Sequence, residues 1–173
     1  MPIDLSVNLS SRQFRDPDLL GAIGAALATS GLPAANLKVE ITESAMLDAE
    51  ASDLLMRRIR DMGIRLAVDD FGTGYSGLSY FQRFPLDTLK IDKSFVAGMG
   101  RDPRSDAIVH ATIAFAKALG LTVTAEGIET EDQFERCRDL GADRGQGYLF
   151  ARPLDPAAVD TYLAAAARSV SAA

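Results

Sequence analysis

Carboxylate, amide and ammonium side chains recur in this sequence at or near the ends of short apolar runs. They are Asn8, Glu40, Asp69, Asp70, Lys90, Glu126 and Gln146, with Glu43, Asp92 and Glu129 close by. Oxygen donors without thiolates or imidazoles favour a hard divalent cation, Mg²⁺ or Mn²⁺, with Ca²⁺ as an unproductive occupant. Two such cations about 3.5–4 Å apart would suit phosphodiester hydrolysis, because they activate water and stabilise the leaving oxygen.

Two of these positions carry charges that need a partner. The adjacent carboxylates of Asp69 and Asp70 repel each other unless a cation lies between or beside them. Lys90 stands between Leu89 and Ile91, in a run that we expect to be buried. Its ammonium would neutralise a substrate phosphate, or a lowered pKa would make its amine a base near neutral pH.

The stretch 66–77, LAVDDFGTGYSG, places Gly72, Gly74 and Gly77 in the spacing of a dinucleotide-binding loop. In such a loop the bare N–H groups of a helix N-terminus bind a pyrophosphate. Here two aspartates directly before the first glycine would repel that pyrophosphate, and the next helical segment reaches Pro85 after barely two turns. We therefore interpret the stretch as a flexible loop beside a metal site.

Six apolar runs alternate with helical segments, which is the order of a parallel α/β fold. We expect strands at residues 5–9, 37–42, 65–71, 88–92, 121–127 and 147–150, because these runs are dense in Val, Ile and Leu without polar alternation. Cap signals mark the helices: Asp–Pro pairs at 16–17, 102–103 and 155–156, a capping box at Thr130 and Gln133, and terminal glycines at 31, 63, 120 and 141.

Six βα repeats fit either a doubly wound sheet or a TIM-type (β/α) barrel that is two strands short of the usual eight. In both folds the carboxyl ends of the strands form the edge at which sites are built. We expect a single domain over residues 1–173, with a frayed tail at 164–173.

The composition limits the possible partners. The 173 residues carry a formal net charge of −6, which argues against binding of a nucleic-acid polymer. Cys137 and His110 are the single residues of their types, so a disulfide within the chain is excluded and a Cys/His zinc site nearly so. We expect both to be packing or surface residues. No apolar run approaches the roughly 20 residues of a membrane span, and we expect a cytoplasmic protein without membrane contact.

The motifs SVNLS, KVEITES, LAVDDFGTGYSGLSYFQRFPLDTLKID, TAEGIET and GQGYLFARPL follow one another between Leu5 and Leu154. Together they resemble the EAL-domain family, bacterial phosphodiesterases of the second messenger cyclic di-GMP. The resemblance implies a (β/α)₈ barrel that cuts one phosphodiester of cyclic di-GMP to give linear pGpG, with Mg²⁺ or Mn²⁺.

The resemblance also implies roles for individual residues. Asn8, Glu40 and Asp69 would be ligands of a metal ion, and Asp70 would serve a second one. Lys90, beside Asp92, would be the base or would orient the attacking water.

Later motifs add to this set by the same resemblance. Glu126 would be a further carboxylate of the metal site, supported by Glu129, and Gln146 would donate or accept a hydrogen bond near the water or the ligand. Glu43 would steady the loop that contains Phe71, Gly72, Thr73 and Gly74, which in the family links the site to dimerisation and regulation.

One departure from the family pattern affects the expected activity. The family's E-A-L glutamate lies upstream of the SVNLS strand, and no E-A-L tripeptide occurs here. On this pattern the chain opens at the third strand, so the first two strands and one metal ligand are absent. We expect a phosphodiesterase domain that is inactive or impaired in this form, and that self-associates, for example as a homodimer.

Two alternatives remain. In the first, the chain is a degenerate domain that binds cyclic di-GMP or a protein partner without hydrolysis. In the second, it is an unrelated sugar-phosphate barrel enzyme, which fits the architecture but not the motifs. An upstream sensory domain would make it the cytoplasmic part of a larger sensor.

Overall fold

The computed structural model of the protein describes residues 3–43, 49–72, 81 and 83–170, of which 49–51 and 166–170 are described by their backbone alone. Its centre is one parallel sheet of six strands that pair in chain order. The strands are β1 (Leu5–Leu9), β2 (Leu37–Thr42), β3 (Arg65–Phe71), β4 (Thr88–Ile91), β5 (Thr122–Glu126) and β6 (Arg144–Gln146). Among the described residues, β1 and β6 each pair with one neighbour only. The fold is an incomplete α/β barrel, as the sequence predicts.

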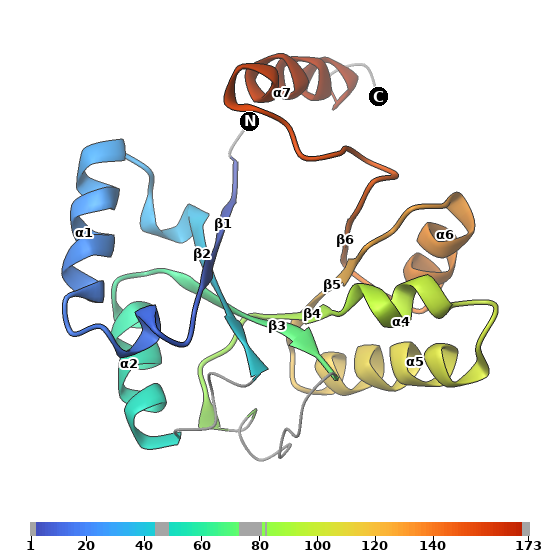
Figure 1. Ribbon diagram of the computed structural model, residues 1–173, viewed down its shortest axis with the longest axis horizontal. Coiled ribbons are helices and arrows are strands. Elements are labelled where there is room, and N and C mark those ends of the chain that lie inside the picture. The colour runs from blue at the N-terminus through green and yellow to red at the C-terminus, as the bar shows by residue number, and fades with distance from the viewer. Residues whose placement is uncertain (1–2, 44–48, 73–80, 82, 171–173) are drawn as a thin grey trace.

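Helices connect the strands and lie along one side of the sheet, except for the last helix, which follows β6 (Figure 1). They are α1 (Leu19–Ser30), α2 (Ala49–Asp61), α4 (Lys93–Gly98), α5 (Pro103–Ala118), α6 (Glu131–Asp139) and α7 (Pro156–Val170), with short 3₁₀ turns η1 (Gln13–Arg15) and η2 (Ala34–Asn36). In Figure 1, α1 and α2 flank one half of the sheet and α4, α5 and α6 the other, while α7 stands apart. No helix in the described ranges is long and apolar enough to cross a membrane.

The two faces of the sheet differ in chemistry because side chains alternate along each strand. One face carries the fully buried core residues, and it packs against the helices. Its members include Ile41, Leu66, Val68, Leu89, Ile91 and Val123. The alternate positions, which we call the inner face, are polar: Lys38, Glu40 and Thr42 on β2, Asp69 on β3, Lys90 on β4 and Glu126 on β5. The sheet is therefore apolar outside and charged inside.

Most of the predicted elements are confirmed. The strands at 5–9, 37–42 and 65–71 have the expected bounds, and those at 88–92 and 121–127 are shorter by one residue at one or both ends. Asp102 caps α5 by accepting hydrogen bonds from the backbone N–H groups of Arg104 and Ser105. Thr130 and Gln133 form the predicted capping box of α6. Helix α7 runs on to Val170, through part of the predicted tail.

Two predictions about elements are wrong. The last strand is Arg144–Gln146, and the apolar residues 147–150 form a turn in which the Leu149 N–H donates to the Ile128 carbonyl at 3.0 Å. A Cβ atom at Gly147 would lie 2.2 Å from that carbonyl oxygen, so the chain turns where only glycine fits. The Asp16 side chain does not cap α1, which begins at Leu19; it accepts instead from the N–H of Asp18 at 2.9 Å.

Candidate metal centre

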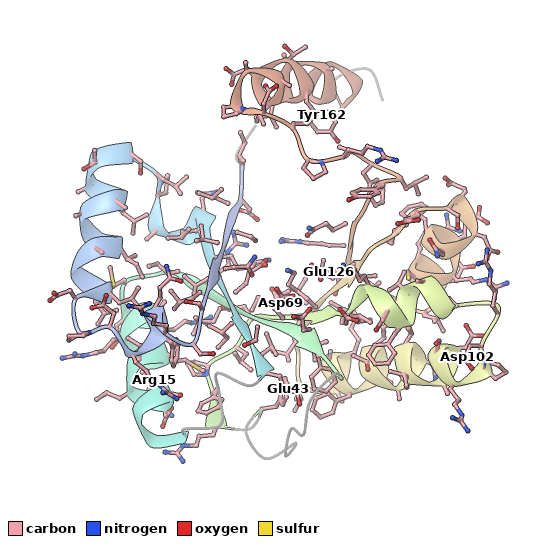
Figure 2. The ribbon with its side chains drawn as sticks, in the orientation of Figure 1. Arg15, Glu43, Asp69, Asp102, Glu126 and Tyr162 are labelled. Atoms are coloured by element: carbon pink, nitrogen blue, oxygen red, sulfur yellow. The ribbon has the colours of Figure 1, made fainter. Side chains whose placement is uncertain are left out.

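The carboxyl ends of the strands bring most of the predicted site residues to one place. In the register of the sheet, Asn8 on β1 lies beside Glu40 on β2, and Glu126 on β5 lies beside Gln146 on β6. Predicted site residues are therefore neighbours at both edges of the sheet. Gln146 is the last residue of β6, so it also lies at the carboxyl end of its strand. From the sequence we had placed it at the start of the last strand. Figure 2 shows Asp69 and Glu126 near each other on the inner face.

The gathered residues line two cavities. The first, of about 400 Å³, is lined by Asn8, Leu9, Ser10, Gln13, Glu40, Thr42, Asp69 and Asp70. The second, of about 240 Å³, is lined by Lys93, Glu126, Gly127, Glu129, Gln146, Gly147 and Tyr148. Thr42 was not predicted, although the two-residue period of β2 after Glu40 places it on the same face. Gln13, Lys93 and Tyr148 were not predicted either, because no spacing signal marks them.

Lys90 lies at the centre of the carboxylates. Its Nζ atom is 2.5 Å from Oε2 of Glu40, 2.7 Å from Oε1 of Glu126 and 3.1 Å from Oδ1 of Asp69. Burial alone would lower the pKa of this ammonium, but the hydrogen bonds to Glu126 and Glu40 outweigh burial and raise it. The alternative of a lowered pKa is therefore wrong in this structure, and Lys90 is a fixed positive charge.

The repulsion predicted between the adjacent aspartates affects the pKa of Asp70. Burial, then the charges of Asp69 and Asp92, raise the pKa of its carboxyl. Its backbone has a φ of 55°, and the β3–β4 register shifts between Val68 and Phe71, so the chain bends where Asp70 leaves the strand. This bend places two consecutive aspartates beside the same cavity.

Asp92 has a structural task as well. Its side chain caps α4 by accepting from the N–H of Ser94 at 2.9 Å. Burial acts to raise the pKa of Asp92, and the hydrogen bonds from Ser94 outweigh it, so the pKa is lowered. Asp92 thus stays charged beside Asp70, which adds to the local negative charge.

Glu126 adds a third carboxylate beside Asp69 and Asp70. Burial raises the pKa of its carboxyl, against the opposing effect of Lys90. One oxygen from each of Asp69, Asp70 and Glu126 lies within 4.8 Å of the others. With Glu40 these carboxylates outnumber the ammonium of Lys90, so negative charge remains that a cation would neutralise. Carboxylate oxygens at this spacing fit a hard divalent cation.

Glu43 lies at the entrance to the loop that follows β3. Its Oε2 atom accepts a hydrogen bond from the N–H of Gly72 at 3.2 Å, and its Oε1 atom is buried without a partner among the described residues. Gly72 has a φ of 95°, which favours glycine. Phe71 packs edge-on against Phe81 with ring centroids 5.2 Å apart. Thr73 and Gly74 lie outside the described residues.

Comparison with known proteins identifies the family. The family model described as the EAL domain matches residues 1–153. The chain belongs to the EAL domain family. The resemblance inferred from the motifs is thereby confirmed.

Named phosphodiesterases and solved structures are among the proteins similar to this EAL domain. Cyclic di-GMP phosphodiesterase RocR of Pseudomonas aeruginosa is 42% identical over 154 residues, which cover 88% of this chain and 39% of RocR. The structure of the PaMucR phosphodiesterase in complex with c-di-GMP matches with a TM-score of 0.87 and 39% identity, over 90% of this chain and 64% of that one. Klebsiella pneumoniae BlrP1, in a manganese and cyclic di-GMP complex, matches with a TM-score of 0.79 and 34% identity, over 87% and 39% of the two chains. The chain spans about a fifth to two fifths of the length of its curated relatives.

Proposed function

We propose that this EAL domain belongs to a cyclic di-GMP phosphodiesterase, which hydrolyses cyclic di-GMP to linear pGpG with Mg²⁺ or Mn²⁺. The observation that carries the proposal is the group of carboxylates around Lys90 at the carboxyl ends of the strands. RocR bears this activity in its name, and PaMucR and BlrP1 have been solved with the same nucleotide. We further propose that the domain acts in the cytoplasm as part of a larger signalling protein.

The donors at the carboxyl ends of the strands fit the metal. Asp69, Asp70 and Glu126 would hold it, with Asn8 and Glu40 on the wall of the same site. A bound cation would supply Lewis acidity and lower the pKa of bound water. The oxygen ligands suit Mg²⁺ or Mn²⁺, and Ca²⁺ would bind without supporting turnover.

Lys90 would act through its charge. Its ammonium holds the carboxylates of Glu40 and Asp69 in place and presents a positive charge to the phosphate or to the water that attacks it. As water adds to phosphorus, the bond to a ribose oxygen breaks and that oxygen takes up a proton. An ammonium near the phosphate would stabilise the negative charge that develops in this step.

The second cavity would receive another part of the nucleotide. Gln146 offers an amide that can donate and accept hydrogen bonds, and Lys93 adds a cation to the same wall. Glu129 lies on this wall and would support the orientation of the polar groups. Glu43, through its hydrogen bond to Gly72, would steady the loop beside the site.

The test is formation of pGpG from cyclic di-GMP in the presence of Mn²⁺. It is best made with a chimaera in which the part of the PaMucR phosphodiesterase outside the matched region is joined to the chain. We expect turnover by the chimaera and its loss in Asp69→Asn, while Asp132→Asn, on the exposed surface of α6, stays active. A folded chimaera that binds Mn²⁺ and yields no pGpG would contradict the proposal.

A second candidate is a domain that binds cyclic di-GMP without hydrolysing it. It is favoured by Lys90, whose ammonium contacts the carboxylates of Glu40, Asp69 and Glu126 and so offers no free amine as a base. Calorimetry with cyclic di-GMP in the presence of Ca²⁺ separates the two functions. Binding by the chain and the chimaera, with no pGpG from either in Mn²⁺, would favour this candidate.

A further inference from the structure

The inner face of the sheet carries a second charged group, at the opposite end from the metal centre. Lys38 and Arg65 are register partners near the N-terminal ends of β2 and β3, and Arg144 is the first residue of β6. Lys38 lies two residues before Glu40 on the same strand, so its side chain shares the inner face with Glu40. The inner face is thus cationic at the N-terminal ends of the strands and anionic at their carboxyl ends.

Asp4 brings these cations together from distant strands. Its Oδ1 atom lies 2.5 Å from Nη2 of Arg65, and its Oδ2 atom lies 3.6 Å from Nη1 of Arg144. Asn36 donates a further hydrogen bond to Oδ1 of Asp4 at 3.2 Å. Strands β3 and β6 are not neighbours in the sheet, yet both reach one carboxylate because the sheet curls.

The donors of this group exceed its acceptors. Lys38 is only 5% exposed, and burial together with the charges of Arg144 and Arg65 lowers the pKa of its ammonium. The Nε atom of Arg65 is buried and has no acceptor among the described residues. A buried N–H without an acceptor and like charges held close together are both unfavourable. The carboxylate of Asp4 offsets only one of the three positive charges.

We propose that Lys38, Arg65 and Arg144 form a binding site for a phosphate-type oxyanion at the N-terminal ends of the strands. A tetrahedral dianion matches the two positive charges that remain, and its oxygens can accept from an ammonium and from a guanidinium at the same time. The side chain of Arg144 is 45% exposed, which gives a ligand access from solvent. The anion is either free phosphate or the phosphate group of a larger molecule.

The test is thermal unfolding of the chain in inorganic phosphate and in chloride at equal ionic strength, with EDTA present so that no divalent cation takes part. We expect phosphate to raise Tm with saturation. Lys38→Met should weaken phosphate binding about tenfold or more, because it removes a charge-assisted hydrogen bond. Arg144→Gln, at a more exposed position, is a second variant with less risk to folding.

The matched control is Lys117→Met, which removes a lysine paired with Asp143 at 2.5 Å on the surface. It should keep the full phosphate response, as should Asp69→Asn, which disables the metal centre and so separates this site from the proposed catalytic one. Equal Tm in phosphate and chloride would overturn the proposal, and so would an unchanged phosphate response in Lys38→Met and Arg144→Gln. Glycerol phosphate separates the two sources: binding as tight as that of phosphate supports a phosphomonoester ligand, and weaker binding supports free phosphate.

Discussion

Lys90 and Glu126 face each other across the β4–β5 pair, with Nζ and Oε1 2.7 Å apart. Both side chains are largely buried, and the same ammonium also reaches Glu40 and Asp69. In a buried group of this kind each charge depends on the others, because removing one partner leaves the rest without compensation. The residue that the sequence suggested for catalysis is therefore also part of what holds the site together.

Lys90→Met tests this double role. Three carboxylates would lose their common cation, and breaking a buried pair of this kind costs about 3–5 kcal/mol of unfolding free energy. We expect a lower urea midpoint without metal, and partial recovery in Mn²⁺, since the cation would neutralise the same oxygens. Lys93→Met, on a cavity wall next to the site, is the control. An unchanged midpoint would mean that the carboxylates do not rely on Lys90.

Asp69→Asn is expected to separate metal binding from folding. The amide keeps the shape of the side chain but removes a negative charge from the group of oxygens formed with Asp70 and Glu126. Hard cations draw much of their affinity from carboxylate charge, so Mn²⁺ binding should weaken by about tenfold or more. Isothermal calorimetry on the wild type, Asp69→Asn and the surface control Asp132→Asn measures this. Equal Mn²⁺ affinity in all three would remove Asp69 from the metal site.

The loss of folding stability at acid pH should depend on Asp4. The hydrogen bond from Arg65 is the main cause that lowers the pKa of this carboxyl below its ordinary value. A lowered folded pKa means that the stabilisation is present above the unfolded pKa of about 3.9 and is lost as the pH falls through the folded pKa. Asp4→Asn should therefore have a lower Tm than the wild type at pH 7, and the difference should disappear in acid.

The sequence predicted the convergence of the metal-site residues because parallel strands end at one edge, whatever the details of the loops. Asn8, Glu40, Asp69 and Glu126 follow from that rule alone. Their burial against Lys90 was not predictable, since spacing along the chain does not reveal which side chains touch across strands. The protonation state of Lys90 was left open for the same reason.

The errors in the elements have a different cause. Residues 147–150 are apolar, so hydrophobicity placed the last strand there, whereas the exposed strand Arg144–Gln146 has no apolar residue to mark it. Its backbone pairs with β5 regardless of its side chains. The cationic group around Lys38 was missed because its arginines come from strands that are brought together only by the curl of the sheet.

Self-association is expected through β1, which pairs with β2 alone among the described residues. Leu5 and Val7 are 49% and 45% exposed, and a largely apolar cavity of about 420 Å³ lies between β1 and α1. Helix α1 has no charged residue and none of its side chains is fully buried. Such a surface favours contact with another copy. Light scattering should detect an oligomer whose mass falls in Val7→Lys, while Ile108→Lys, on α5, leaves it unchanged; a monomer at all concentrations would contradict the expectation.

The last prediction is that the chain alone has little or no phosphodiesterase activity, in contrast to the chimaera with the remaining part of the PaMucR phosphodiesterase. The sequence contains no E-A-L tripeptide, and the resemblance to the family assigns the glutamate of that motif to the metal site. The metal site would thus lack one of the anionic ligands that the family pattern gives it. Catalysis also needs its groups held within about half an ångström of the productive geometry, to which a sheet is poorly suited when its first and last strands each pair with one neighbour among the described residues.

The decisive measurement is the rate of pGpG formation by both proteins at the same Mn²⁺ concentration, together with their affinity for cyclic di-GMP. We expect at least a hundredfold lower rate for the chain, on the order of the effect of losing one catalytic group, and a much smaller loss of binding, because both cavities of the carboxyl edge are already formed. Comparable rates would show that another carboxylate takes the place of the glutamate. If the rate then fell on dilution, that carboxylate would come from a second copy of the chain, and the self-association expected at β1 would have a catalytic purpose.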